Sequence, residues 1–269
     1  MCARKAHIGK VCKRLKIRVP LPLVVLLWFG SLSAQPPGPP GPPPAARLGA
    51  PVDLTGTWVS VVTEDWRYRM MSPPKGDYVG VPLNPEGRKT ADAWDPAKDE
   101  AAGEQCRAYG AGAILRMPGR LRISWQGDET LKVETDAGTQ TRTLVFKGPP
   151  TGSGSWQGSS AASWDRPGSP FGFQLGLGIT GGVTGGSLKS VTTQMKPGYL
   201  RKNGVPYSAA AVQTEYWDRF DVPGGDSLLV VSSELVDPTY LGQPFWTSSH
   251  FKKTGDGAGW NPSACSARQ

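Results

Sequence analysis

The sequence predicts an all-β fold: an antiparallel up-and-down β-barrel with two short helices after the first strands. Three observations lead to this class. Short runs with rough apolar and polar alternation recur along the chain, turn residues separate them, and helix-start signals are concentrated in one short region. An antiparallel sheet of about nine or ten strands usually closes on itself, because closure removes its unpaired edges.

Residues 1–34 are predicted to be a cleaved secretory signal peptide. Seven basic residues and no acidic one precede an apolar run at 19–29, and small residues follow at 31–34. The alternative is an uncleaved membrane anchor, but the apolar run is shorter than the ~20 residues that a spanning helix needs and contains Pro20 and Pro22. We therefore expect no stable membrane span, and a periplasmic or secreted protein.

A proline-rich linker is predicted at 35–51, followed by a single barrel domain at 52–266. The segment PPGPPGPPP is too short for a collagen triple helix and is typical of a stiff polyproline spacer. Within the domain, residues 167–186 are rich in glycine, and we interpret them as a surface insertion that acts as a flap.

The net charge of +8 comes mostly from the signal peptide, because the remaining chain has 23 basic and 22 acidic residues. No basic field remains to attract phosphates, so we expect no nucleic-acid partner. His250 is the only histidine outside the signal peptide, which excludes a metal site with two or three histidine ligands. A P-loop and a dinucleotide fingerprint are both missing from the sequence, so we expect neither a metal nor a cofactor.

Two cysteines, Cys106 and Cys265, remain after removal of the signal peptide. Cysteines in exported proteins are usually paired, so we predict a disulfide between them. Neither belongs to a Cys-x-x-Cys motif, which argues against a redox or zinc role.

The elements are predicted in order. The run TWVSVVT gives the first strand, and Asn84-Pro85 and Asp95-Pro96 each combine a helix N-cap with proline at the first helical position. The remaining strands are expected at 114–117, 121–126, 130–136, 139–146, 159–165, 188–195, 211–220, 227–236 and 245–253.

Gly56-Thr57-Trp58, at the start of the first strand, resembles the glycine–any–tryptophan signature of lipocalins and other calycin barrels, although an ordinary buried strand tryptophan is the alternative. Longer segments resemble an uncharacterised family of exported bacterial proteins; these are residues 58–70, 75–96, 105–110, 188–208 and 234–251. The resemblance implies export and a calycin-like barrel, and it implies no activity.

The segment from Glu64 to Arg69 mixes charged and aromatic residues most densely. In a strand, Asp65, Arg67 and Arg69 share one face, opposite Trp66. The functional interpretation is an anion-binding group at the barrel mouth, with Arg67 or Arg69 binding a ligand carboxylate. The alternative is a solvated face with a weak Asp65–Arg67 pair.

Three further segments are candidates. If Tyr216 faces outward, then Glu215, Trp217 and Arg219 share the inner face. Glu215 and Arg219 would then form a structural or a substrate-orienting pair, and burial would make Glu215 a possible base. His250 lies on a polar strand face and is either catalytic or an ordinary surface residue. The loop 201–208 either carries binding groups at one rim or is an ordered connection with solvated basic residues.

These observations favour an exported barrel that binds a small apolar or aromatic molecule in an aromatic-lined cavity. The predicted ligand-binding residues are Trp58, Trp66, Arg67, Arg69, Trp125, Tyr216, Trp217 and Arg219. One alternative is a cofactor-free lyase, isomerase or hydrolase that uses Glu215 or Asp65 as the base, with Arg67, Arg69 or His250 stabilising charge. Another is an envelope module whose glycine-rich segment docks a partner protein.

Overall fold

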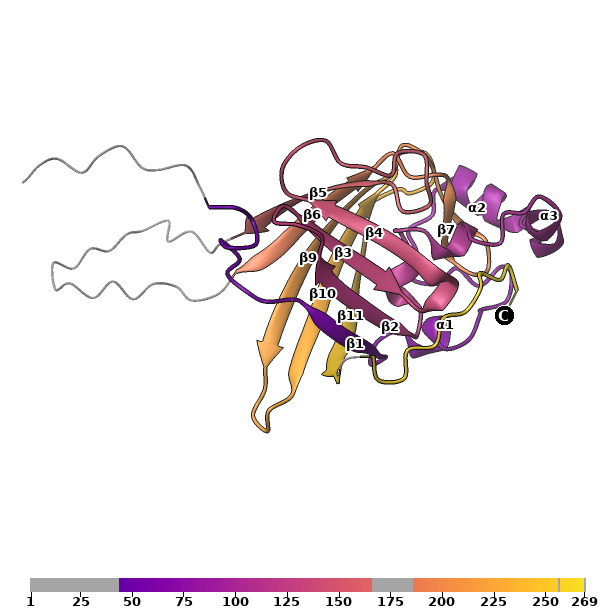
Figure 1. Ribbon diagram of the computed structural model, residues 1–269. Helices are drawn as coiled ribbons and strands as arrows, with labels where there is room; N and C mark the ends of the chain where they lie inside the picture. The colour runs from indigo at the N-terminus through magenta and orange to yellow at the C-terminus, as the bar shows by residue number, and fades with distance from the viewer. Residues whose placement is uncertain (1–43, 166–185, 256, 269) are drawn as a thin grey trace, which may run out of the picture. The chain divides into compact units, whose positions relative to one another are not determined.

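The computed structural model describes residues 44–165, 186–255 and 257–268. These residues form a closed β-barrel with short helices and a small hairpin at one end (Figure 1). The predicted signal peptide, residues 35–43 of the predicted linker and residues 167–185 of the predicted insertion lie outside the described residues.

Nine strands form the barrel. They are β1 (Gly56–Val61), β2 (Arg120–Trp125), β3 (Thr130–Thr135), β4 (Gln140–Val145), β5 (Ser159–Asp165), β6 (Ser187–Thr193), β9 (Val212–Asp221), β10 (Ser227–Val236) and β11 (Phe245–Thr254). They follow one another around the ring in chain order, and β11 closes the ring against β1. The predicted all-β barrel is confirmed.

One pairing departs from the antiparallel pattern. Strands β4 and β5 are parallel, with Leu144 opposite Ser160, whereas the other eight pairings of the described ring are antiparallel. A closed ring with an odd number of strands cannot alternate in direction throughout. At least one parallel pair is therefore a consequence of closing nine strands.

The two predicted helices are present as α2 (Pro85–Asp92) and α3 (Pro96–Ala101). The side chain of Asn84 accepts a hydrogen bond from the Gly87 amide at 2.8 Å, and that of Asp95 accepts one from the Ala97 amide at 3.0 Å. Each cap satisfies an amide that has no partner within the helix.

Other elements at the same end differ from the prediction. A four-residue helix, α1 (Trp66–Arg69), replaces the strand considered there, and η2 (Ile114–Arg116) replaces the strand predicted at 114–117. The 201–208 segment belongs to a hairpin of β7 (Gly198–Arg201) and β8 (Val205–Tyr207). The remaining short elements are η1 (Arg107–Tyr109) and η3 (Ala137–Thr139).

The prediction at 114–117 is wrong because three consecutive side chains, Ile114, Leu115 and Arg116, are all buried. An alternating strand would expose at least one of them. Ile114 and Leu115, together with Tyr109, pack against the core side chains of the barrel and cover its end.

Side chains fill the interior of the barrel. Trp58, Trp217, Leu131, Leu229 and Phe251 come from different strands, belong to one packed cluster and are at most 1% exposed. A side chain on the wall of a water-sized cavity would keep some accessible surface. The interior around these residues is therefore a packed core, as in other small barrels, rather than the predicted aromatic-lined hollow.

The predicted disulfide is confirmed: Cys106 and Cys265 are bonded, with Cα atoms 5.1 Å apart. It fixes residues 257–268, which we call the C-terminal strap, to the covered end of the barrel. Within the strap, the Ser263 amide donates to the Asp136 carbonyl at 2.9 Å, and the Ser266 amide donates to the Tyr109 hydroxyl at 3.3 Å. A disulfide is consistent with an oxidising compartment.

Candidate functional site

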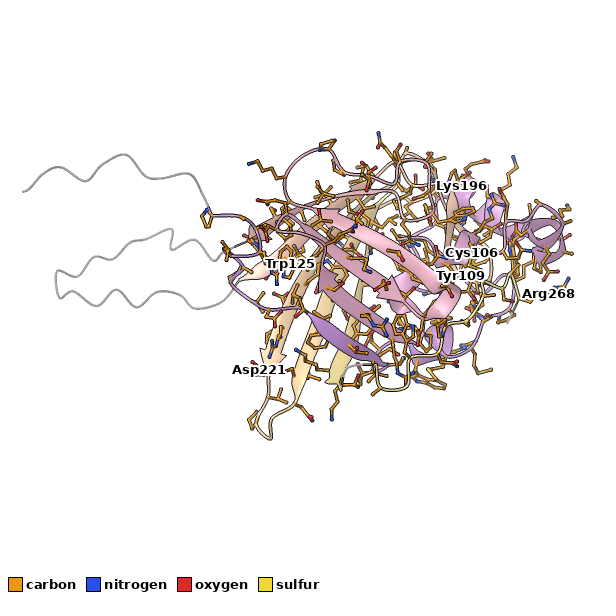
Figure 2. The ribbon with its side chains drawn as sticks, viewed as in Figure 1. Cys106, Tyr109, Trp125, Lys196, Asp221 and Arg268 are labelled. Atoms are coloured by element: carbon orange, nitrogen blue, oxygen red, sulfur yellow. A yellow bond between two sulfur atoms is a disulfide. The ribbon has the colours of Figure 1, made fainter. Side chains whose placement is uncertain are left out.

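The predicted site residues lie in three separate regions. Glu215 and Trp217 are inside the barrel, Trp125 and Arg219 are toward its far end, and the segment around α1 is at the covered end. Figure 2 labels Tyr109 at the covered end, with Trp125 and Asp221 away from it. The structure therefore does not assemble all the predicted residues into one site.

Glu215 is fully buried and accepts four hydrogen bonds. Arg142 on β4 donates two of them, at 2.7 and 3.1 Å, while Ser190 donates one at 3.0 Å and Gln213 one at 2.8 Å. A carboxylate offers about four acceptor positions. These contacts use them all, so the geometry is that of a structural ion pair rather than of a free base.

The expected pairing of Glu215 with Arg219 is wrong, because Arg142 occupies that place. Arg219 lies near the end of β9, beyond the last buried residue of that strand. Its guanidinium donates to Asp221 at 2.9 Å and to the Asp53 carbonyl at 2.9 Å.

Trp125 belongs to an aromatic cluster with Phe146 and Trp164, whose ring centroids are 5.1 to 6.4 Å apart. The Trp164 indole donates to the Ala46 carbonyl at 2.8 Å, so this cluster holds the segment that leads into β1. Tyr216 is half-buried on the other face of β9 from Glu215, with the Lys189 ammonium 5.5 Å from its ring.

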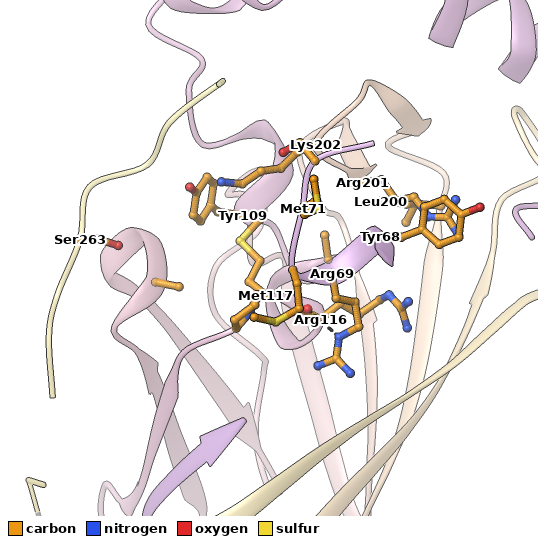
Figure 3. A pocket seen from close by; sticks show the side chains of 15 residues that line it. Tyr68, Arg69, Met71, Tyr109, Arg116, Met117, Leu200, Arg201, Lys202 and Ser263 are labelled. Atoms are coloured by element: carbon orange, nitrogen blue, oxygen red, sulfur yellow. Dashed lines mark hydrogen bonds between the residues drawn. The ribbon is translucent and has the colours of Figure 1, made fainter. Parts of the chain in front are cut away.

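A cavity of about 440 Å³ lies at the covered end, beside α1 (Figure 3). Its lining combines cationic, sulfur-containing, aromatic and aliphatic side chains. The residues are Tyr68, Arg69, Met70, Met71, Ser72, Tyr109, Ala113, Arg116, Met117, Pro118, Ala137, Leu200, Arg201, Lys202 and Ser263. Four of these residues are basic and none is acidic.

Two of the basic residues are held by carboxylates outside the cavity lining. Arg69 forms an ion pair with Glu64, and its Nε donates to the Arg116 carbonyl at 2.8 Å. Arg116 donates from Nη2 to Asp65 at 2.7 Å. These contacts fix both guanidinium groups and neutralise part of their charge.

The other two basic residues form no ion pair within the described parts of the chain. Arg201 donates to the Val79 carbonyl at 2.8 Å, and its guanidinium lies 4.2 Å from the Tyr68 ring centroid. The Lys202 ammonium lies 5.0 Å from the ring centroid of Tyr109 (Figure 3). The cavity therefore carries two cationic side chains that form no direct ion pair in the described part of the chain, although Asp65 and Asp77 lie close enough to act on Arg201 electrostatically.

Among the arginines that line the cavity, three buried guanidinium nitrogens have no hydrogen-bond partner in the described part of the chain: Nη2 of Arg69, Nη1 of Arg116 and Nε of Arg201. Burial lowers the pKa of Arg69 and of Arg201, and in both cases repulsion from Arg116 acts in the same direction. Buried donors are normally satisfied. Three incompletely satisfied cations around one cavity form a site that favours an anion.

The remaining wall is apolar and adaptable. Met71, Met117 and Leu200 line it together with Tyr109. Tyr109 lies directly against Gly138, where an added Cβ would come within 2.3 Å of the ring. Gly138 also has a φ of 68°, so both its conformation and its small size help to position this wall.

The charged segment predicted around residues 64–69 is thus close to the cavity, but with a different geometry. Because α1 is a helix, Asp65, Arg67 and Arg69 do not share a strand face. Arg69 lines the cavity and Asp65 supports Arg116, whereas Arg67 points to Asp77 at 2.8 Å and Trp66 is exposed.

His250 is placed beside the same network but does not line the cavity. Its Nδ1 lies 2.7 Å from the Thr63 hydroxyl and 3.2 Å from the Glu64 carboxylate. Glu64 in turn binds Arg69, which lines the cavity, so His250 is connected to the site through Glu64.

Sequence reasoning found Arg69 and the 201–208 segment, but it missed Arg116, Tyr109 and Met117. An arginine between Leu115 and Met117 in an apolar run was the available signal, since a buried arginine needs a partner or a function.

Among the described residues, no group of three histidine, cysteine, aspartate or glutamate side chains could hold a metal ion. In that same part of the chain, no helix has the length and hydropathy required to cross a bilayer. Comparison of the chain with protein-family models, with curated proteins and with solved structures gave no match.

Proposed function

We propose that this protein binds a small amphipathic anion, an apolar molecule with a carboxylate or comparable anionic group, in the cavity at the covered end. The main support for this proposal is the set of residues that line the cavity. Four basic residues and no acidic residue face a cavity whose other walls contain methionine, leucine and tyrosine.

An anionic group in the cavity would balance the charge of the guanidinium groups that line it. Arginine binds carboxylates through paired, charge-assisted hydrogen bonds. Arg201 and Arg116 place guanidinium groups in the lining, and Met71, Met117 and Leu200 supply an apolar surface for the rest of the ligand. Such a combination of a few polar groups and apolar walls is usual for small-molecule sites.

This proposal keeps the predicted class, a barrel that binds a small apolar or aromatic molecule, and changes two details. The ligand binds at the end of the barrel instead of inside it, and it carries a negative charge. Export to the periplasm or beyond, and kinship with calycin barrels, remain part of the proposal, supported by the disulfide and by the closed barrel.

The enzymatic alternative has less support from the geometry. The acceptor positions of Glu215 are filled, and Asp65 is bound to Arg116. The alternative of a partner-docking flap concerns residues outside the described part of the chain.

The test compares dodecanoate with dodecanol, which has the same chain length and no charge, by isothermal titration calorimetry. We expect dodecanoate to bind at least about tenfold more tightly, because a hydrogen bond to a charged group contributes about 1.5–3 kcal/mol. Arg201→Met should remove most of this preference.

Arg67→Met is the matched control, because Arg67 is on α1, is mostly exposed and does not line the cavity. It should leave both affinities unchanged. Equal binding of dodecanoate and dodecanol by the unmodified protein, or a dodecanoate preference that survives Arg201→Met, would contradict the proposal.

A further inference from the structure

Exposed apolar side chains occur on α1 and in the segment that follows it, and two of them, Met70 and Met71, line the cavity. Trp66, Met70, Met71 and Val79 are 63%, 57%, 61% and 69% exposed, and we call these four residues the apolar rim. Single exposed apolar residues are ordinary, whereas a group of them beside a ligand cavity marks an interaction surface.

The members of the apolar rim are tied to the cavity by specific contacts. The Met70 amide donates to the Trp66 carbonyl at 2.8 Å, so these two side chains lie one helical turn apart on α1. Met70 and Met71 also line the cavity. The Val79 carbonyl accepts a hydrogen bond from Arg201, which lines the cavity, so Val79 lies next to a lining residue.

Basic residues accompany the apolar rim. Lys75 is exposed in the same segment and donates to the Trp94 carbonyl at 2.9 Å, and Lys202 lines the cavity without an ion pair in the described part of the chain. Arg67 is also exposed, and its charge is balanced by Asp77. Tryptophan and other large apolar side chains that enter the headgroup region, with lysine or arginine beside them, are the features by which peripheral proteins bind anionic membranes.

We propose that the apolar rim docks on the surface of an anionic lipid bilayer, from which the amphipathic anion enters the cavity. This inference rests on the proposed function, because a molecule with an apolar chain and an anionic group partitions into such a surface. Contact between Met70 or Met71 and the bilayer would keep the apolar chain away from water during transfer.

The experiment measures sedimentation of the protein, purified after export, with vesicles of phosphatidylcholine with and without phosphatidylglycerol. We expect binding to the vesicles that contain phosphatidylglycerol and about tenfold weaker binding for Trp66→Ala, since the indole is a large part of the inserted apolar area. Val79→Ser should also weaken binding.

Phe220→Ala is the matched control. Phe220 is 53% exposed near the end of β9, away from the apolar rim, and its replacement should not change vesicle binding. An equal loss for Phe220→Ala and Trp66→Ala, or no vesicle binding by the unmodified protein, would overturn the docking proposal. A shift from dimer to monomer in Trp66→Ala without vesicle binding would also overturn it and would assign the rim to a second copy of this chain.

Failure of this inference is distinguishable from failure of the proposed function. Trp66 does not line the cavity, so Trp66→Ala should bind dissolved dodecanoate as the unmodified protein does. An unmodified protein that binds the vesicles but does not prefer dodecanoate to dodecanol would contradict the proposed function and leave the docking surface standing. Loss of dodecanoate binding in Trp66→Ala would contradict the separation of the docking surface from the ligand site.

Discussion

Arg142 and Arg201 are both buried, yet their surroundings give them different roles. Arg142 shares two hydrogen bonds with Glu215 and donates a further one to Thr192 at 3.2 Å. Arg201 has a carbonyl and an aromatic ring as neighbours and no carboxylate paired with it in the described chain. The first arginine is neutralised within the fold, while the second keeps its charge available for a ligand.

The Arg142–Glu215 pair predicts a large loss of stability when one partner is neutralised. Glu215→Gln should lower the free energy of unfolding by about 3–5 kcal/mol, because it leaves Arg142 charged and buried without its counterion. Urea unfolding measures this. The double variant Arg142→Met with Glu215→Leu should recover part of the loss; a Glu215→Gln protein as stable as the unmodified one would contradict the structural role.

Tyr207 gives a prediction that depends on pH. Its hydroxyl is buried without a hydrogen-bond partner among the described residues, and burial is the main cause that raises its pKa. The folded state therefore holds the phenol proton more tightly than the unfolded state. This contribution to stability is complete below the unfolded pKa of about 10 and is lost as the pH rises through the folded pKa.

Tyr207→Phe should consequently unfold less readily in alkali than the unmodified protein. At neutral pH it should be neutral or stabilising by about 1 kcal/mol, since it removes an unsatisfied hydroxyl. Unfolding by urea at neutral and at alkaline pH provides the comparison. A destabilisation of more than about 1 kcal/mol at neutral pH would show that the hydroxyl has a partner.

At the scale of elements, most of the strands were predictable and several of the end-covering elements were not. The helices after Asn84 and Asp95 are set by local chemistry, because the cap and the proline lie next to each other in the sequence. Helix α1 depends on distant contacts: Arg69 must reach the Arg116 carbonyl. The apolar and polar pattern of a four-residue helix cannot reveal a contact with a residue so far along the chain.

Asn84 links helix α2 to the loop after β10. Its side chain caps Gly87 and also donates to the Thr239 carbonyl at 3.0 Å. Asn84→Ala should cost about 1 kcal/mol or slightly more of stability. Asn84→Asp, which can still cap the helix but cannot donate, should cost less, and equal losses in thermal unfolding would contradict this division.

The C-terminal strap predicts a coupling between the disulfide and the site. Cys265→Ser opens a loop with a sequence separation of 159 residues, for which the entropy model gives about 4–5 kcal/mol. It should also weaken dodecanoate binding, because Ser263 in the strap lines the cavity. Unfolding and calorimetry measure the two effects. Unchanged affinity in the folded variant would show that the strap does not shape the site.

At the scale of the whole molecule, the packed interior explains why the cavity lies at an end. Alternation along each strand predicts which side chains face inward, but it does not give the volume they fill together. Trp58 and Trp217 come from β1 and β9, and with the inward side chains of the other strands they occupy the core. Space for a ligand remains where α1, η2 and the β7–β8 hairpin meet.

This arrangement also explains why the site could be predicted only in part. Arg69, Arg116 and Arg201 lie far apart in the sequence, and the folded end of the barrel brings them together. Arg69 and Arg201 belong to segments that the sequence already marked as candidates for ligand binding. Arg116 belongs to an apolar run that folds as a short 3₁₀ turn. That conformation depends on the packing of Ile114 and Leu115 against the barrel core, which the local sequence does not reveal.

A crystal structure of the protein with bound dodecanoate would locate the ligand and its partners. We expect the carboxylate to accept hydrogen bonds from Arg116 and Arg201, with the alkyl chain against Met71, Met117 and Leu200. A chain inserted among Trp58 and Trp217 inside the barrel, or a carboxylate that contacts none of the cavity arginines, would contradict it.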